Sequence, residues 1–213
     1  MSDERRGPTR YERSGTGLEF DRVAFFSDAV YAIAMTLLVV GIGVPHVRDA
    51  NLGRALSDLD SSIISFFIGF FVLAYYWVSH HQFFGQLRAV NTPLLVVNLA
   101  YLAVVAFLPF PTAIVGDHGD LPLAFVLFAG CLAAVSVLEV GLYICAIRYD
   151  LLQHAPDATL RRHDVIAGLI PAIVIVASVP LAFASTRYAF LAWLLIFPAE
   201  MLLDRVIPDP RKA

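Results

Sequence analysis

Charged side chains are scarce in this sequence: Asp, Glu, Lys and Arg make up 15% of its 213 residues, whereas 59% of the residues are hydrophobic. The mean hydropathy is +0.73. Soluble domains carry about 25% charged residues, so this composition excludes a soluble globular protein. The net charge of −3 says little about partners. No basic block occurs outside the polar tails, and nucleic acid is therefore not an expected partner.

Cysteine is also rare, with Cys131 and Cys145 as the two examples. They lie on one predicted helix at a distance of about 21 Å along its axis, which is too far for a disulfide. We expect two buried thiols. The polar N-terminal segment lacks the apolar middle of a cleavable signal peptide, so we expect the first membrane helix to be retained.

Motifs of common enzymes are missing. The sequence contains no His-Glu-x-x-His, no Gly-x-Ser-x-Gly and no phosphate-binding glycine loop. The adjacent residues His80 and His81 point about 100° apart on a helix and make a poor metal pair. We therefore expect neither enzymatic activity nor a bound metal.

Long apolar stretches are what the sequence does contain. A bilayer core of about 30 Å needs roughly 20 apolar residues per spanning helix, and six such stretches occur. They are Glu19–Val44, Ser61–Phe84, Thr92–Phe110, Leu121–Ile147, Asp164–Phe183 and Tyr188–Val206. The sequence thus predicts an all-α integral membrane protein, with tails at 1–18 and 208–213 and a six-helix domain at 19–207.

Capping residues and prolines predict several helix ends. Thr92-Pro93 has the pattern of an N-cap followed by a first-turn proline, and Asp164 precedes an apolar run. We expect helices to stop at Pro45, at the Pro109/Pro111 pair and at Pro208, because proline cannot donate the backbone hydrogen bond that continues a helix.

The distribution of basic residues predicts the orientation, because cytoplasmic flanks of membrane helices collect Lys and Arg. With six spans and a cytoplasmic N-terminus, 12 basic residues fall inside. Only Arg48, Arg54 and Arg187 then fall outside. Both termini are therefore expected in the cytoplasm.

Several ionisable or polar side chains fall inside the predicted spans, where they are costly and usually face protein or water. At 1.5 Å rise per residue, Asp28 reaches the same depth as Trp77, His80 and His81. Three further residues fall at a similar depth: Asn98, Glu139 and Glu200. The spacing predicts one polar layer in the inner half of the bundle, serving either as interhelical hydrogen bonds or as a proton-responsive site.

Two stripes run along the first predicted helix. One contains the small residues Ala29, Ala32, Thr36 and Gly43, and the other contains Ile33, Leu37 and Val40. Small residues let another backbone approach closely. The bulky stripe fits lipid contact, core packing or a hydrophobic pore constriction, and periodicity alone leaves these alternatives open.

Two motifs resemble a known family. The run Arg22-x-x-x-Phe26-Ser27-Asp28, continued as Ala-Val-Tyr-Ala-Ile-Ala-Met-Thr-Leu-Leu-Val, resembles the first-helix signature of the transmembrane-protein-175 potassium channels in their bacterial single-repeat form. The segment Trp77-Val-Ser-His-His81 resembles a second family pattern. The resemblance implies a multi-pass homotetramer in a prokaryotic cell membrane, whose four first helices line a central pore for K⁺ and other monovalent cations. It implies no cofactor apart from the permeating ion.

The resemblance also implies roles for individual residues. The pore constriction is expected at Ile33, Leu37 and Val40, with valine at the last position where leucine is more usual, and Thr36 is expected to favour potassium. A structural or gating network behind the pore would contain Arg22, Phe26, Ser27, Asp28, Trp77 and one of His80 and His81. No Thr-Val-Gly-Tyr-Gly filter occurs in the sequence.

Two other functions compete with a passive potassium channel. A proton- or cation-coupled transporter would use Asp28, the two histidines and Glu139 as titrating groups. Such transporters often contain internal repeats and matched helix breaks, and the sequence shows neither. A purely structural membrane protein is the remaining alternative.

Overall fold

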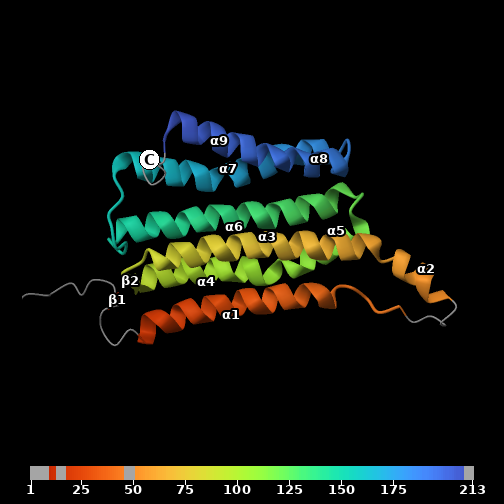
Figure 1. The fold of residues 1–213 in the computed structure, drawn as a ribbon, viewed down its shortest axis with the longest axis horizontal. Coiled ribbons are helices and arrows are strands. Elements are labelled where there is room, and N and C mark those ends of the chain that lie inside the picture. The colour runs from red at the N-terminus through yellow and green to blue at the C-terminus, as the bar shows by residue number, and fades with distance from the viewer. Residues whose placement is uncertain (1–9, 13–17, 46–50, 209–213) are drawn as a thin grey trace, which may run out of the picture.

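The computed structural model describes residues 10–12, 18–45 and 51–208, in which long helices run side by side (Figure 1). The helices are α1 (Leu18–Val40), α2 (Leu52–Ser57), α3 (Asp60–Gly85), α4 (Thr92–Phe107), α5 (Pro109–His118), α6 (Pro122–Arg148), α7 (Ala158–Ala182), α8 (Thr186–Ala192) and α9 (Ile196–Val206). A 3₁₀ turn, Trp193–Leu195, joins α8 to α9.

Five helical segments are long and apolar enough to cross a membrane. They are Phe20–Val40, Asp60–Gly85, Thr92–His118, Pro122–Arg148 and Ala158–Ala182. The prediction of a helical membrane protein is confirmed at this level. The five segments overlap the first five of the six predicted spans, with shifted ends.

The sixth predicted span, 188–206, is not one continuous helix. It is divided into α8, the 3₁₀ turn and α9. Pro198 explains the break, because a proline ring clashes with the carbonyl group four residues earlier. That carbonyl belongs to Leu194, which lies within the 3₁₀ turn.

The prediction that a helix stops at the Pro109/Pro111 pair is confirmed for α4, which ends at Phe107, but the predicted end of the third span at Phe110 is wrong. Both prolines fall in the first turn of α5, where a missing backbone N–H costs nothing. Leu108 keeps helical backbone angles and donates to the carbonyls of Val104 and Val105. The apolar segment therefore continues to His118.

Other helix ends are shifted by a few residues. The first helix ends at Val40, before Gly41 and Gly43 rather than at Val44. The fifth long helix begins six residues earlier than predicted, because Asp157, and not Asp164, caps it by accepting from the Leu160 N–H. Thr92 does begin a helix, but Asn91 provides the cap.

A small two-stranded sheet interrupts the helical pattern. β1 (Arg10–Glu12) pairs antiparallel with β2 (Ala89–Asn91), with Tyr11 opposite Val90. Part of the segment predicted to be a tail is thus hydrogen-bonded to the α3–α4 connection. A three-residue strand has no detectable alternation, which is why the sequence pattern did not indicate it.

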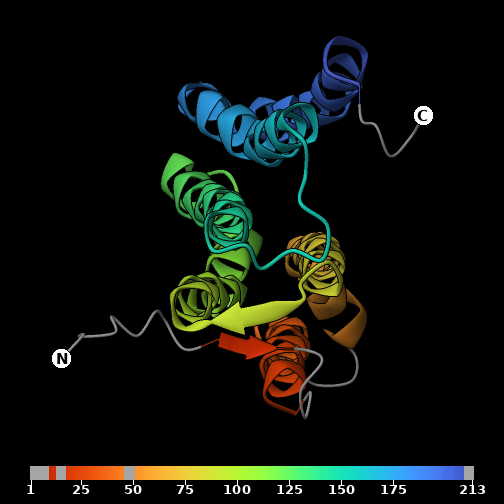
Figure 2. The ribbon, with the colours of Figure 1, turned by 90° about the vertical axis from the view of Figure 1, so that its left-hand side faces the viewer.

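The helices are stacked so that α1 lies at one edge of the bundle. Figure 2, a view along the helices, shows α7, α8 and α9 as a layer on the far side of α6, while α1 lies at the opposite side. The neighbouring helices of α1 are α3, α4 and α5, and β1 contacts it as well. One side of α1 is not covered by the rest of the described chain.

Glycines allow the closest helix crossings. A Cβ atom at Gly69 of α3 would lie 2.7 Å from Thr112 Cγ2 of α5, and one at Gly168 of α7 would lie 2.6 Å from Val140 Cγ2 of α6. These distances are shorter than carbon atoms tolerate. Close backbone approach through small residues is typical of helix packing in membranes.

Candidate functional site

Helix α1 has one buried face. Its buried side chains are Phe20, Ser27, Tyr31, Ala34 and Leu38, each less than 5% exposed. Spacings of seven, four, three and four residues place them on one side of a helix. This face packs against α3, α4 and α5 and fixes the rotation of α1 about its own axis.

The predicted constriction residues lie on the other side of α1. Ile33, Leu37 and Val40 are 58%, 46% and 73% exposed in the isolated chain, and Thr36 beside them is also exposed. They therefore point away from the bundle that carries them. A face of this kind meets lipid, another subunit or a pore, and their role in a constriction stays a prediction.

Thr36 has a defined hydrogen bond on this exposed face. Its Oγ1 donates to the Ile33 carbonyl oxygen at 2.8 Å. Because the hydroxyl proton is engaged within the helix, the oxygen lone pairs remain available on the exposed side. The arrangement can offer an oxygen ligand to a cation.

The buried face of α1 is joined to α3 and α4 by a chain of polar side chains. Asn98 Nδ2 of α4 donates to Ser27 Oγ at 3.0 Å, and His80 Nε2 of α3 donates to Asn98 Oδ1 at 2.8 Å. Ser27 Oγ in turn donates to the Val23 carbonyl oxygen at 3.0 Å. All three side chains in the chain are at most 2% exposed.

Aromatic rings surround His80. Its ring stacks on Phe84 and on Tyr101, with centroid distances of 4.5 and 5.3 Å. The Tyr101 hydroxyl is hydrogen-bonded to the Tyr31 hydroxyl of α1. Tyr31 and Tyr101 were not singled out by the sequence analysis, although Tyr31 lies one turn from Ser27 and thus on its face of the helix.

Asp28 makes a separate contact with α3. Trp77 Nε1 donates to Asp28 Oδ1 at 2.9 Å, and His81 Nδ1 lies 4.0 Å from the same oxygen. The Asp28 side chain is 36% exposed and borders a cavity of about 180 Å³ together with His80 and His81. The two histidines are thus separated: His80 bonds to Asn98, while His81 lies near Asp28.

The remaining members of the predicted network stay apart from these contacts. The side chains of Arg22 and Phe26 are both exposed. Within the described ranges, no hydrogen bond or ion pair joins the Arg22 side chain to another residue, and no group of three or more His, Cys, Asp or Glu side chains is placed to hold a metal ion. The network roles of Arg22 and Phe26 stay predictions.

The predicted polar layer is split in two. Asn98 joins the α1 contacts, but Glu139 and Glu200 line a different cavity of about 450 Å³ among side chains of α3, α6, α7 and α9. One carboxylate oxygen of Glu139, Oε1, is buried without a hydrogen-bond partner. The sequence predicted how deep Glu139 and Glu200 lie along the bundle. It did not predict that they lie on a different side of α3 from Asp28.

Comparisons with known proteins point to one family. The sequence model described as "Endosomal/lysosomal potassium channel TMEM175" matches residues 22–109, which include both motifs, α3, α4 and all but the first four residues of α1. A protein from Streptomyces collinus named as a potassium channel is 40% identical over 101 residues, covering 47% of this chain and 49% of that protein.

Longer matches extend beyond this region. A potassium channel from Chamaesiphon minutus is 32% identical over 170 residues, covering 74% of this chain and 82% of that protein. The human endosomal/lysosomal proton channel TMEM175 is 24% identical over 202 residues, which are 89% of this chain but only 40% of the human protein. The crystal structure of a lysosomal potassium-selective channel TMEM175 homolog from Chamaesiphon minutus superposes with a TM-score of 0.70 and 26% identity, covering 87% of this chain and 98% of that one. This chain belongs to the TMEM175 family.

Proposed function

We propose that the protein is a potassium-permeable cation channel in which four copies of α1 surround a central pore. The observation that carries this proposal is the division of α1 into an anchored face and an exposed face with Ile33, Leu37 and Val40. The names of the two bacterial relatives, which refer to potassium channels, support the same function.

A ring of four such helices would form a hydrophobic pore constriction. Bulky apolar side chains from each copy would narrow the pore, and narrow apolar segments block ions by losing water. The exposed small residues Ala29 and Ala32 beside the bulky strip leave room for a neighbouring helix. Closed cyclic symmetry is the usual arrangement for identical subunits.

Thr36 is the proposed selectivity residue. Four hydroxyl oxygens, each with its proton donated to the Ile33 carbonyl group, would face a partly dehydrated cation. A single ring of hydroxyls replaces fewer hydration waters than a continuous carbonyl filter does. We therefore propose a modest preference for K⁺ over Na⁺.

The polar contacts of Ser27 and Asp28 are proposed to anchor the pore helix. They hold α1 to α3 and α4 at the level where the bilayer would otherwise penalise a carboxylate. Asp28 lies outside the exposed strip of Ile33, Leu37 and Val40. Its proposed role is structural or gating rather than ion coordination.

We place the protein in a prokaryotic cell membrane with its N-terminus in the cytoplasm. In the described residues, the end of the bundle where α1 begins also carries Arg88, Arg148, Arg161, Arg162 and Arg205, whereas the other end carries Arg54 and Arg187. We call the former the arginine-rich end. Basic residues favour the cytoplasmic side.

Current through protein reconstituted into planar bilayers tests the proposal. A passive potassium channel gives a current whose reversal potential follows the K⁺ gradient at fixed proton and sodium concentrations. Proton permeation is measured in the same bilayer from the shift with a pH gradient, since the human relative is named as a proton channel. A current that is absent, or independent of the K⁺ gradient, contradicts the proposal.

The second candidate is a proton-coupled carrier. The observation that favours it is the pair of cavities on two sides of α3, one with Asp28 and His81 and the other with Glu139 and Glu200. A carrier moves protons and its substrate in fixed stoichiometry. Its reversal potential would depend on both gradients together, which the bilayer experiment distinguishes from passive K⁺ flux.

A further inference from the structure

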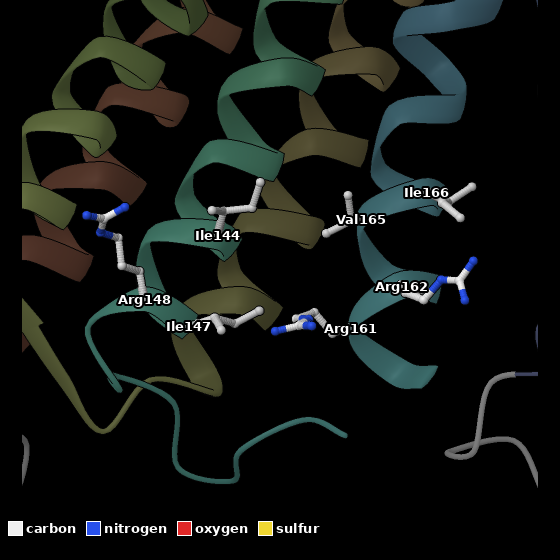
Figure 3. A pocket seen from close by; sticks show the side chains of 7 residues that line it. All are labelled: Ile144, Ile147, Arg148, Arg161, Arg162, Val165 and Ile166. Atoms are coloured by element: carbon white, nitrogen blue, oxygen red, sulfur yellow. The ribbon is translucent and has the colours of Figure 1, made fainter. Parts of the chain in front are cut away.

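A cavity of about 610 Å³ opens between α6 and α7 at the arginine-rich end (Figure 3). Its charged lining consists of Arg148, the last residue of α6, and of Arg161 and Arg162 near the start of α7. Its apolar lining consists of the branched side chains Ile144, Ile147, Val165 and Ile166. The cavity is separate from α1 and from the contacts of Asp28.

On both α6 and α7, the arginines lie nearer the helix end than the branched apolar side chains that line the cavity. Ile144 precedes Arg148 by one turn, and Val165 and Ile166 follow Arg161 and Arg162 by one turn. Residues four apart lie on one helix face at a distance of about 6 Å along the axis. Ile144, Val165 and Ile166 thus lie one turn nearer the middle of their helices than the arginines, which is the order expected where a helix enters a bilayer.

In the part of the chain that the structure describes, none of the three arginine side chains makes a hydrogen bond or ion pair with another residue. Arg88 at the same end provides the contrast, because its guanidinium binds both the carboxylate and the backbone carbonyl of Asp150.

Nearby carboxylates are engaged elsewhere. Asp157 accepts from the Leu160 backbone N–H at the start of α7. Asp164 accepts from the Tyr143 hydroxyl at 2.8 Å and borders the cavity that contains Glu139 instead. The positive charge of the α6–α7 cavity is consequently not neutralised by these two groups.

We propose that this cavity binds an anionic phospholipid, with its phosphate on Arg161, the positive charges of Arg148 and Arg162 nearby, and an acyl chain along Ile144 and Val165. Basic pockets between membrane helices on the cytoplasmic side are known to accept anionic headgroups. In Figure 3, Arg161 reaches into the space between the two helices, whereas the guanidinium groups of Arg148 and Arg162 point away from that space on either side. Arg161 is therefore the expected phosphate contact, and Arg148 and Arg162 add positive charge around it.

A lipid fits the lining better than a free phosphate does. Four of the seven lining side chains are branched hydrocarbons, and Ile144 is 49% exposed in the subunit. A soluble anion would leave this apolar surface uncovered. Each arginine near the membrane surface contributes about fivefold in affinity for anionic lipid.

Binding of phosphatidylglycerol to the delipidated full-length protein tests the proposal. Native mass spectrometry in detergent counts bound dioleoyl phosphatidylglycerol against dioleoyl phosphatidylcholine. We expect saturable binding with a preference for phosphatidylglycerol, and a loss of at least tenfold in the triple variant Arg148→Gln, Arg161→Gln, Arg162→Gln. The triple Arg→Lys variant should retain most of the preference, because it keeps the charge.

The double variant Arg54→Gln, Arg187→Gln, at the other end of the bundle, is the matched control and should bind like the wild type. If the triple Gln variant does not fold, Arg161→Gln alone should still weaken binding several-fold. An unchanged preference in the folded Gln variants would overturn the proposal. So would full competition by glycerol 1-phosphate, since that result would indicate a free-phosphate site. Neither result depends on ion conduction, so the test stands apart from the proposed channel function.

Discussion

The indole Nε1 of Trp77 donates a hydrogen bond to Oδ1 of Asp28 across 2.9 Å and joins α3 to α1. The two residues are 49 positions apart in the sequence, and the bond between them is partly buried. Asp28 has a second neighbour in His81, whose Nδ1 is 4.0 Å from the same oxygen. A carboxylate in an apolar helix is therefore explained by donors on the adjacent helix.

Loss of this carboxylate should weaken the anchoring of α1. We expect Asp28→Ala to lower the free energy of unfolding by about 0.5–1.5 kcal/mol, the usual contribution of one hydrogen bond, and to lower the yield of assembled particle. Asp28→Asn keeps the acceptor oxygen and should lose less. Size-exclusion yield and thermal unfolding in detergent measure both effects. An alanine variant that assembles and conducts normally would count against the anchor.

Polar substitutions in the proposed pore constriction should let water enter it. Ile33→Ser and Leu37→Ser should each raise the basal K⁺ current, because a wetted constriction loses its barrier. Val39→Ser is the control, since Val39 is also 53% exposed on α1 but lies off the strip. Liposome flux assays compare the three variants. Equal effects at Val39, or unchanged current at Ile33 and Leu37, would remove these residues from the pore.

The Thr36 hydroxyl should set the preference for K⁺. Thr36→Ala removes the oxygen that donates to the Ile33 carbonyl group at 2.8 Å, and the reversal potential under mixed K⁺ and Na⁺ should move toward non-selectivity. Thr36→Ser keeps the hydroxyl and should stay near the wild-type value. An alanine variant with unchanged selectivity would show that Thr36 does not contact the ion.

The Asn98 amide should contribute to stability rather than to conduction. Asn98→Leu removes two hydrogen bonds and leaves the buried Ser27 and His80 groups without their partner, at a cost of about 1–3 kcal/mol. Val96→Leu on the exposed side of α4 is the control and should be nearly neutral. Unfolding in mixed detergent measures the difference, and equal stability of the two variants would contradict the buried chain.

The α3–α5 crossing should depend on the absence of a side chain at Gly69. Gly69→Ala would bring a Cβ atom to 2.7 Å from Thr112 Cγ2, and overpacking of this kind costs about 1–3 kcal/mol. Adding Thr112→Ser removes that methyl group and should restore part of the loss. Gly130→Ala, where no atom lies within 4 Å, is the neutral control. A stable Gly69→Ala protein would show that the crossing is looser than described.

Sequence alone predicted five long helices from the length of their apolar runs, and the rise of 1.5 Å per residue predicted the depth of the polar residues. Asp28, Trp77 and Asn98 do come to one level, as expected. Glu139 comes to that level on another side of α3, because the neighbour that each helix face meets is decided by packing and not by spacing. Likewise, Pro109 and Pro111 indicate that a helix ends, but they do not indicate whether the chain then turns away. The helical backbone angles of Leu108 let α5 follow α4 directly and prolong the apolar segment.

The arrangement of α1 in the assembled particle is the central claim. Cryo-electron microscopy of the purified protein in lipid nanodiscs measures it directly. The account predicts a particle of four subunits, with the four α1 helices adjacent to the symmetry axis and the Ile33–Val40 strip facing that axis. A single-subunit particle, or an assembly with α1 on the lipid-facing periphery, would contradict it.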